Sequence, residues 1–229
     1  MIQFKDIIKQ YNGVTVLDIP DLKIQAGENI GLVGNNGAGK TTAFSLLLDL
    51  IKATSGVVLS QGMDVSKDES WKAYTSSYFD ESFLIDFLTP DEYFDFIGTL
   101  NNWNKATLTE FLNGYAEFFN EEVIGKKKYI RDLSKGNQKK VGLIGSLIGN
   151  PEVVVLDEPF SNLDPTSQIR LKRLIKDASD GRTFLISSHD LNHVVEVCDR
   201  IIILEKGLVV KDLINSEETV REIEAYFDV

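Results

Sequence analysis

A glycine-rich segment near the start of the chain carries residue types that can bind phosphate. Residues 34–41 read GNNGAGKT, which is a glycine, four residues, a second glycine, a lysine and a threonine. Glycines let successive backbone amides turn toward one anion, while a lysine and a hydroxyl supply a charge and a metal ligand. Apolar residues precede this segment and an apolar helical pattern follows it. The pattern therefore predicts a phosphate-binding loop between a buried strand and a helix whose N-terminus favours an anion.

Each residue type in this loop has an expected task. Lys40 can reach the β- and γ-phosphates of a nucleotide, and the Thr41 hydroxyl can ligate Mg²⁺. Gly34, Gly37 and Gly39 are expected to adopt backbone conformations that are closed to residues with a Cβ. The residues expected to line the nucleotide are Asn35, Asn36, Gly37, Ala38, Gly39, Lys40, Thr41 and Thr42.

Two carboxylates stand at the end of a second apolar segment. Residues 153–156 read VVVL and are followed at once by Asp157 and Glu158. A continuous apolar run of this length is typical of a strand that is buried on both faces. At the carboxyl end of a parallel strand beside the phosphate loop, Asp157 can hold Mg²⁺ and Glu158 can polarise an attacking water. The two acids could instead only cap the next element, but a phosphate loop in the same chain favours chemistry.

The two histidines of the chain follow another predicted strand, over residues 184–187. His189 comes directly after that strand's end, where its side chain can hydrogen-bond a γ-phosphate. His193 lies four residues on, in the next predicted helix, and is expected to be a surface or packing residue.

Composition excludes several classes of protein. The chain has 229 residues, of which 43% are hydrophobic, so it can bury one sizeable core. Its net charge of −11 argues against a nucleic-acid partner. Its longest apolar runs are strand-sized and too short to span a membrane, and the first twelve residues show no apolar core of a signal peptide. One basic patch, expected to be a solvated face or to approach phosphates, comprises Lys126, Lys127, Lys128, Arg131, Lys135, Lys139 and Lys140.

Turn and capping residues predict the remaining elements. Two strands should flank the turn at 12–13, and residues 26–28 should close a hairpin that leads into the strand at 29–33. Thr89 with Glu92, and Thr107 with Glu110, each have the spacing of a helix-capping box. Ser134 should cap a further helix, and the acidic segment 216–227 should be helical.

Aromatic residues are concentrated between residues 71 and 119, where there are 14. At helical spacing they predict a compact helical core, but some of them could line a groove for another protein. Tyr11, before the turn at 12–13, could likewise be a packing residue or could stack on an adenine.

Taken together and in this order, these residues resemble the ATP-binding subunits of the ABC transporter family. The resemblance extends from Tyr11 to Gly207 and rests on several separate motifs. The matching segments are GNNGAGKT for the phosphate loop, LSKGN for the family's signature, VVVLDEP for the strand with the Mg²⁺ ligand and the catalytic glutamate, SNLD for the loop after it, and His189 for the switch histidine.

The resemblance implies ATP hydrolysis with Mg²⁺, in which Glu158 and His189 are catalytic. It implies that two ABC subunits, identical or different, meet head to tail, so that each ATP lies between one phosphate loop and the partner's signature helix. Ser134, Gly136 and Asn137 would then contact the partner's ATP. It also implies a separate membrane permease, which would hold this chain on the cytoplasmic side as a peripheral protein of the inner membrane face.

Three positions depart from the family pattern. Lys135 and Asn137 replace the usual glycine and glutamine of the signature, as in a branch that resembles the exporters of the ABC-2 type. Glu81 stands where the family has a glutamine. Glu81 could still contact the Mg²⁺ shell, but a carboxylate accepts hydrogen bonds without donating them.

These observations predict an α/β P-loop NTPase fold with a parallel core sheet, an antiparallel N-terminal β portion and an α-helical insertion near 82–145, with residues 1–229 forming one ATP-binding domain. The predicted function is ATP hydrolysis that powers transport, with export favoured. A soluble ABC ATPase of translation or DNA repair is one alternative, disfavoured by the acidic composition and the single phosphate loop. An ATP-gated binding module is another, disfavoured by Glu158 and His189.

Overall fold

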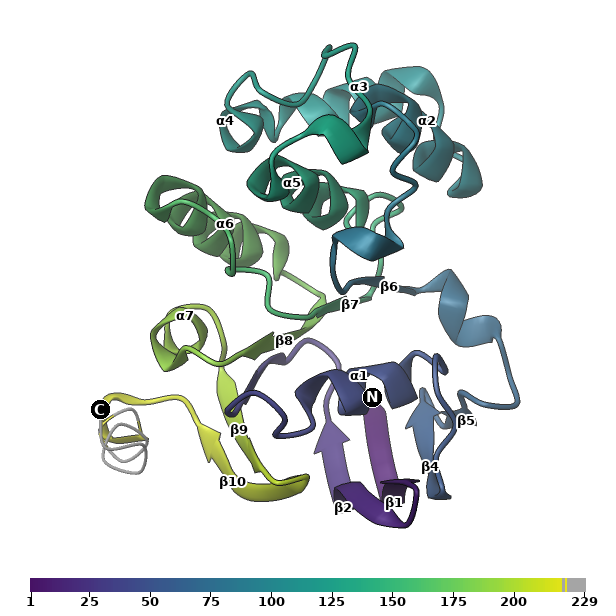
Figure 1. The fold of residues 1–229 in the computed structure, drawn as a ribbon, viewed down its shortest axis with the longest axis vertical. Coiled ribbons are helices and arrows are strands. Elements are labelled where there is room, and N and C mark those ends of the chain that lie inside the picture. Colours follow the sequence, from purple (N-terminus) through teal and green to yellow (C-terminus); the bar gives the residue numbers. More distant parts are fainter. Residues whose placement is uncertain (220, 222–229) are drawn as a thin grey trace.

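The computed structural model describes residues 1–219 and residue 221 (Figure 1). In that part of the chain, ten strands form one sheet in the order β5-β4-β1-β2-β10-β9-β3-β8-β7-β6. The strands are β1 (Ile2–Tyr11), β2 (Val14–Ile24), β3 (Asn29–Val33), β4 (Ser55–Ser60), β5 (Met63–Asp64), β6 (Thr75–Tyr78), β7 (Val153–Leu156), β8 (Thr183–Ser188), β9 (Arg200–Glu205) and β10 (Leu208–Ile214). The α-helices are α1 (Lys40–Leu47), α2 (Pro90–Leu100), α3 (Lys105–Asn113), α4 (Ala116–Phe119), α5 (Lys135–Gly145), α6 (Pro165–Ala178) and α7 (Leu191–Val195).

The sheet has an antiparallel half and a parallel half. β5, β4, β1 and β2 pair antiparallel, whereas β9, β3, β8, β7 and β6 run parallel. β3, β7 and β8 are buried along their whole length, as expected of a parallel sheet covered on both faces. The α/β fold with a parallel core and an antiparallel N-terminal portion is therefore confirmed.

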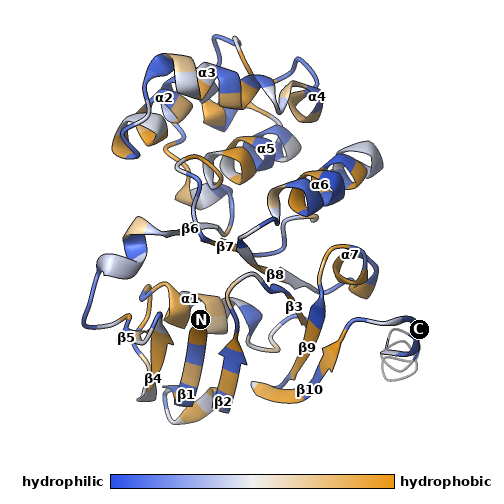
Figure 2. Ribbon diagram, turned by 180° about the vertical axis from the view of Figure 1, so that it is seen from behind, coloured by the Kyte–Doolittle hydropathy of each residue, from blue (hydrophilic) through white to orange (hydrophobic). Residues whose placement is uncertain are grey.

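Two apolar cores lie on the two faces of the parallel strands. Phe184 of β8 packs into the core that contains residues of α5 and α6, while its neighbour Leu185 packs into the core that contains α1. Side chains alternate between the faces of a strand, so β3, β7, β8 and β9 each contribute to both cores. Figure 2 shows hydrophobic and hydrophilic residues alternating along α6, whose apolar stripe includes the buried Leu171 and Ile175.

The hairpin predicted at residues 26–28 is wrong. β3 does not pair with β2 but with β8 and β9, and residues 22–24 simply extend β2. The turn is fixed by β8, because the Gly27 amide donates to Thr183 Oγ1 at 2.8 Å. Two apolar segments around a glycine predict a turn, but they do not say which strands become neighbours.

Helices α2 to α5 gather at one end of the molecule, and in the chain they lie between β6 and β7 (Figure 1). This arrangement confirms the helical insertion. The Thr89 capping box and the Ser134 N-cap are both present. The Thr107 box is wrong, because α3 begins earlier and the Asn104 side chain accepts from the Thr107 amide. The helical spacing of the aromatic residues up to Phe119 is shared by two helices, since α3 ends at Asn113 and α4 begins at Ala116.

Most of the aromatic residues between 71 and 119 are core residues. Phe94 and Phe119 are fully buried and lie 5.7 Å apart, centroid to centroid. Phe83, Phe87 and Phe96 are the exceptions, since their side chains are exposed. Most of the aromatic residues therefore form a compact core, as predicted. These three exposed rings could line a groove for another protein.

The helix predicted over residues 216–227 falls largely outside the described residues. Among those that are described, residues 217–219 and residue 221 are helical.

Helix α5 packs unusually close to β6. A Cβ on Gly142 would lie 2.2 Å from the ring of Tyr78, so only glycine permits this approach. This contact sets the distance between α5, which carries the signature residues, and β6, which leads to Glu81.

We predict that Gly142→Ala lowers the free energy of unfolding by about 1–3 kcal/mol, because the added methyl overpacks a buried contact. Gly98→Ala is the matched control. Its Cβ would meet the flexible side chain of Leu108, with Cδ2 nearest at 3.2 Å, and alanine favours a helix by about 1 kcal/mol over glycine. Urea unfolding of both variants measures the difference, and an equally stable Gly142→Ala chain would contradict the packing argument.

Candidate nucleotide-binding and catalytic site

The sheet topology brings the predicted site residues to one edge. β3, β8 and β7 are adjacent and parallel, with Val33 opposite Ser188 and Leu156 opposite Ile186. The phosphate loop, His189 and the pair Asp157–Glu158 all follow these strand ends. Segments far apart in the sequence therefore meet at the carboxyl edge, which is where ligands bind in such sheets.

The phosphate loop curls back over the start of α1. Gly37 and Gly39 have positive φ angles of 83° and 110°, as expected. Gly34 does not, and the expectation for it was wrong. Glycine is required there because a Cβ would lie 2.3 Å from the carbonyl oxygen of Leu204. The hairpin after Leu204 also supports the loop, since the Gly207 amide donates to the Ala38 carbonyl at 2.9 Å.

A hollow of about 620 Å³ lies against the outer side of this loop. It is lined by Asn35, Asn36, Gly37, Ala38, Leu204, Glu205 and Lys206. Asn35 and Asn36 are exposed, so their amides and side chains are open to a ligand. Residues 204–206 were not predicted to belong to the site, because they reach the loop only through the pairing of β9 with β3.

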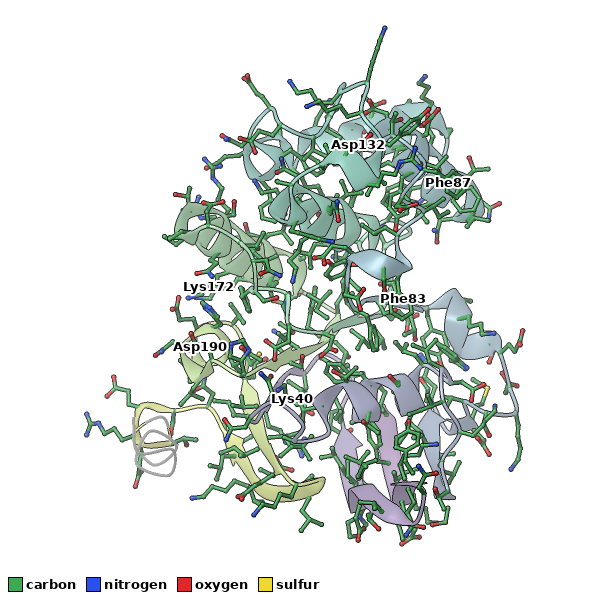
Figure 3. The ribbon with its side chains drawn as sticks, in the orientation of Figure 1. Lys40, Phe83, Phe87, Asp132, Lys172 and Asp190 are labelled. Atoms are coloured by element: carbon green, nitrogen blue, oxygen red, sulfur yellow. The ribbon has the colours of Figure 1, made fainter. Side chains whose placement is uncertain are left out.

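Lys40 lies at the centre of the molecule, at the N-terminus of α1 (Figure 3). Its side chain is buried, and Nζ donates to the Gly34 carbonyl at 2.6 Å. Nζ also lies 3.3 Å from Oε1 of Glu158. The lysine charge is therefore directed at the mouth of the loop and toward the predicted catalytic acid.

Thr41 and Asp157 are in direct contact across the site. Thr41 Oγ1 donates to Asp157 Oδ2 at 2.6 Å, although the two residues are 116 positions apart. Asp157 is only 7% exposed. Burial raises the pKa of its carboxyl above the ordinary value, while hydrogen bonds from Ser187 and Thr41 act against that rise.

Ser187 is a site residue that the sequence analysis missed. Its hydroxyl, fully buried, donates to Asp157 Oδ1 and accepts from the Glu158 amide at 2.9 Å. One hydroxyl thus holds both acids of the pair. The available signal was a serine directly after the apolar residues 184–186 and two positions before His189.

Glu158 is held in an uncommon backbone conformation, with φ 47°. Its Oε2 lies 2.8 Å from His189 Nδ1, and its Oε1 faces the Lys40 amine. The carboxylate is therefore placed between a cation and a histidine at the mouth of the phosphate loop. This is a position from which a carboxylate can accept a proton from a water beside a bound phosphate.

The oxygens of Thr41 and Asp157 form a donor pair that suits Mg²⁺, which prefers hard oxygen ligands. A buried carboxylate also favours a nearby cation. The described residues contain no group of three or more His, Cys, Asp and Glu side chains placed to hold a metal. Such a pair fits an ion that takes its other ligands from phosphates and water.

Glu81 lies at the start of the 3₁₀ turn Glu81–Phe83. Its Oε1 accepts from the Tyr78 hydroxyl at 3.0 Å. Its place in the Mg²⁺ shell stays a prediction.

The signature residues form the first turn of α5. Ser134 is exposed, and its Oγ accepts from the Asn137 amide at 3.2 Å. Lys135 is also exposed, and its Nζ donates to Gln138 Oε1 at 3.3 Å. Among the described residues, no hydrogen bond or ion pair links residues 134–137 to the phosphate loop of the same chain.

Tyr11, at the end of β1, is 48% exposed and lies outside both cores. The amine of Lys9 sits 4.6 Å from the centre of its ring. Adenine stacking by this ring stays a prediction.

Two further expectations are settled by burial. His193 is a packing residue, since its ring stacks on Phe160 at 4.7 Å. The basic patch was wrong in part, because Lys139 and Lys140 are only 3% and 4% exposed and belong to the buried face of α5. The prediction failed because lysines were expected on the solvent-facing side of this helix, whereas Lys139 and Lys140 are buried together with the apolar residues of α5.

Within the described residues, no helix combines the length and the apolar character needed to cross a lipid bilayer.

A phosphate loop ahead of a helix, a buried aspartate paired with its threonine, and a glutamate beside a histidine together define a P-loop ATPase domain. Comparison with known proteins makes the class more specific. The sequence model described as ABC transporter matches residues 17–161, which is more than half of the chain. The chain belongs to the ABC transporter family, as an ATP-binding domain of its ATPases.

Similar proteins carry the same description. An uncharacterized ABC transporter ATP-binding protein of Methanocaldococcus jannaschii, MJ1023, is 35% identical over 91% of this chain and 76% of its own length. YhaQ of Bacillus subtilis, of the same description, is 34% identical over 90% of this chain and 69% of its own length. A relative from Synechocystis is 36% identical, and the chain spans 53% of that protein.

Solved structures agree on the fold. The chain superposes with a TM-score of 0.85 on the ATP-binding subunit of an ABC transporter, at 23% identity, covering 100% of this chain and 93% of that one. It superposes with a TM-score of 0.82 on the ATP-binding cassette MJ0796 in a dimeric post-hydrolysis state bound to ADP and Pi, at 22% identity over 94% of this chain and 99% of that one. The ABC ATPase fold is therefore confirmed.

We predict that Ser187→Ala lowers the free energy of unfolding by about 1–3 kcal/mol, because it leaves two buried polar groups without their partner. Ser188→Ala is the control, since among the described residues the Ser188 hydroxyl accepts only from the Asp190 amide, at 3.0 Å, and contacts neither acid. Urea unfolding of both variants measures the effect. Equal losses would mean that the Ser187 hydroxyl has no special part in holding Asp157 and Glu158.

Proposed function

We propose that this chain is the ATP-hydrolysing subunit of an exporter-type ABC transporter whose membrane permease is a separate chain. The observation that carries the proposal is the placement of the Glu158 carboxylate between Lys40 and His189, next to the Thr41–Asp157 pair. We further propose that residues 1–229 act as one ATP-binding domain, with a helical subdomain at about 82–145.

ATP would bind with its phosphates in the loop. The amides of residues 35–39 and the positive end of α1 favour the negative charge. Lys40 would exchange its contact with the Gly34 carbonyl for the β- and γ-phosphates, and Thr42 would add a hydroxyl. Thr41 and Asp157 would hold Mg²⁺, which neutralises charge on the phosphate oxygens. Glu81 would contact the water shell of that ion, and Tyr11 would stack on the adenine.

Hydrolysis needs an acceptor for the proton of the attacking water. Glu158 would orient the water and accept that proton, and His189 would hydrogen-bond the γ-phosphate. The 2.8 Å contact between His189 Nδ1 and Glu158 Oε2 supports this division of tasks, because it fixes both side chains at one side of the loop.

A second ABC subunit, identical or different, would complete each site. Ser134, Gly136 and Asn137 stand at the N-terminus of α5, a helix end that favours an anion, yet they make no bond to their own phosphate loop. The partner's ATP is the anion that we assign to them. The dimeric cassettes among the solved structures support this pairing.

The permease would dock beside the 3₁₀ turn that carries Phe83. A groove of about 330 Å³ there is lined by Leu48, Leu50, Trp71, Lys72, Thr75, Ser76, Ser77, Tyr78, Phe79, Phe83, Leu84, Tyr93 and Gly142. Phe83 and Phe87 lie on the same side of the molecule (Figure 3), and each is 61% exposed. Docking would hold the chain on the cytoplasmic face of the membrane. A solved relative is described as part of an ABC transporter complex, which supports this assembly.

Export is the favoured direction, because LSKGN and the segment FLTPDEYFDFIG, residues 87–98, resemble the exporter-like branch. A soluble ABC ATPase without a permease is the second candidate, and it would leave Phe83 and Phe87 without a partner. An ATP-gated module that does not hydrolyse ATP is the third, and it would leave the Glu158–His189 pair without a task.

We predict that Glu158→Gln slows ATP hydrolysis by about 10²- to 10⁴-fold, which is the usual rate enhancement from general-base catalysis, while MgATP still binds. Glutamine keeps the shape of the side chain but cannot accept the proton. Asp157→Asn is the matched control, because it weakens the Mg²⁺ site and should reduce nucleotide binding itself.

Steady-state ATPase rates and calorimetric MgATP binding separate the two variants. A Glu158→Gln chain that hydrolyses ATP at the parental rate would refute the role of Glu158. Light scattering with ATP present adds a second observable, since blocked hydrolysis should preserve an ATP-bound dimer if the chain pairs with itself.

We predict that the double variant Phe83→Ser and Phe87→Ser loses co-purification with its membrane subunit but keeps its melting temperature within a few degrees, because both rings are exposed. Phe94→Ser is the contrasting variant, since Phe94 is fully buried and should unfold the helical end. Affinity purification from membranes and thermal scans measure the two effects. Undiminished co-purification of the double variant would exclude this docking surface.

A further inference from the structure

Lys139 is a buried cation whose amine reaches the catalytic loop of its own chain. The residue lies on α5, one turn after the signature, and is 3% exposed. Its Nζ donates to the carbonyl oxygen of Glu158 at 2.9 Å and to Ser161 Oγ at 2.7 Å. Ser161 Oγ in turn donates to the same carbonyl at 2.9 Å. The amine and the hydroxyl therefore converge on one backbone oxygen.

The residue held in this way is strained. Glu158 has a left-handed φ of 47°, a conformation that is costly for a residue with a long side chain and persists only where its surroundings enforce it. The Ser161 amide donates to the Glu158 carbonyl at 3.3 Å and closes a tight turn. The conformation of this turn sets the direction in which the Glu158 carboxylate leaves the backbone.

The electrostatic setting also favours a cation at this point. Burial lowers the pKa of the Lys139 amine, while the carboxylates of Glu81, Glu158 and Asp157 act against that decrease. Nζ lies 5.7 Å from the ring centre of Tyr78, whose hydroxyl donates to Glu81. The amine thus lies between the segment that carries Glu81 and the loop that carries Glu158.

Helix α5 has little freedom to move apart from this loop. A Cβ on Gly136 would lie 3.2 Å from the Asn162 carbonyl, so the first turn of the helix also packs on the loop after β7. Further along α5, Gly142 contacts Tyr78 as described above. A displacement of the signature end would therefore be transmitted through Lys139 to the Glu158 turn.

We propose that Lys139 is a positioning residue that fixes the Glu158 turn and mechanically joins the signature helix to the catalytic carboxylate of the same chain. The proposal rests on the proposed ATPase function and adds a connection within one subunit. The N-terminus of α5 would contact one ATP, and Glu158 would act on the other. The contact through Lys139 makes these two parts of the chain move together. Lys139 touches no reacting atom, so its removal should impair the chemical step while leaving nucleotide binding intact.

The test compares Lys139→Met with Lys140→Met in the full chain. Lys140 is the neighbouring buried lysine of the same helix, but its amine lies over the ring of Phe118 and makes no contact with Glu158. For Lys139→Met we expect kcat for ATP to fall by about 10- to 100-fold, the scale of a misplaced catalytic group, with KM for ATP within about twofold of the parental value. For Lys140→Met we expect kcat to stay within about twofold of the parental rate.

A second observable does not depend on hydrolysis. Hydrogen–deuterium exchange of the peptide spanning residues 157–162 should become faster in Lys139→Met and remain parental in Lys140→Met. Ser161→Ala, which removes only the bridging hydroxyl, should show the same change to a smaller degree and serves if Lys139→Met does not fold. Lys139→Arg, which keeps donors at this position, should recover part of kcat.

The outcomes are distinguishable. Parental exchange of residues 157–162 in Lys139→Met, or a fall in kcat no greater than that of Lys140→Met, overturns the proposal. A parental chain without any ATPase activity refutes the proposed function alone, and the exchange of residues 157–162 then decides whether Lys139 fixes the turn.

Discussion

The buried carboxylate of Asp157 is the constraint on which the site depends. A charged group so far from water must be compensated, and this one has neutral donors, Thr41 and Ser187, and the nearby amine of Lys40. These residues come from α1 and β8, so the compensation of one charge requires three parallel strands to end at the same edge. The same arrangement orients Glu158, whose amide shares the Ser187 hydroxyl with Asp157. Fold and site are thus specified by a common set of polar contacts.

At two positions a glycine lets a functional element pack closer to the sheet than any residue with a Cβ would allow. Gly34 meets the Leu204 carbonyl, and Gly142 meets the ring of Tyr78. In each case the missing Cβ brings a functional element against the sheet, first the phosphate loop and then the signature helix. In both contacts the glycine backbone itself touches its neighbour, so these contacts resist small displacements better than contacts between two flexible side chains would. The two elements proposed to touch ATP in different subunits are therefore both fixed to one rigid sheet.

The sequence predicted the features that are local in the chain. The phosphate loop, the Ser134 cap and the apolar strand before Asp157 each depend on residues within a few positions of one another, and all are present. The failures depend on distant partners. The hairpin at 26–28 was wrong because β3 pairs with β8 instead of with β2. Ser187 and Lys139 were missed as site residues because their importance lies in contacts with a loop about 20 to 30 positions away.

The charge on α5 shows how the departures from the family pattern fit together. Glu81 brings a negative charge to a position where the family pattern has a neutral glutamine. Its carboxylate, like those of Asp157 and Glu158, favours the charged form of the buried Lys139 amine. Gly142 lets α5 approach Tyr78, whose hydroxyl donates to Glu81. The connection from Glu81 through Lys139 to Glu158 is therefore electrostatic as well as steric.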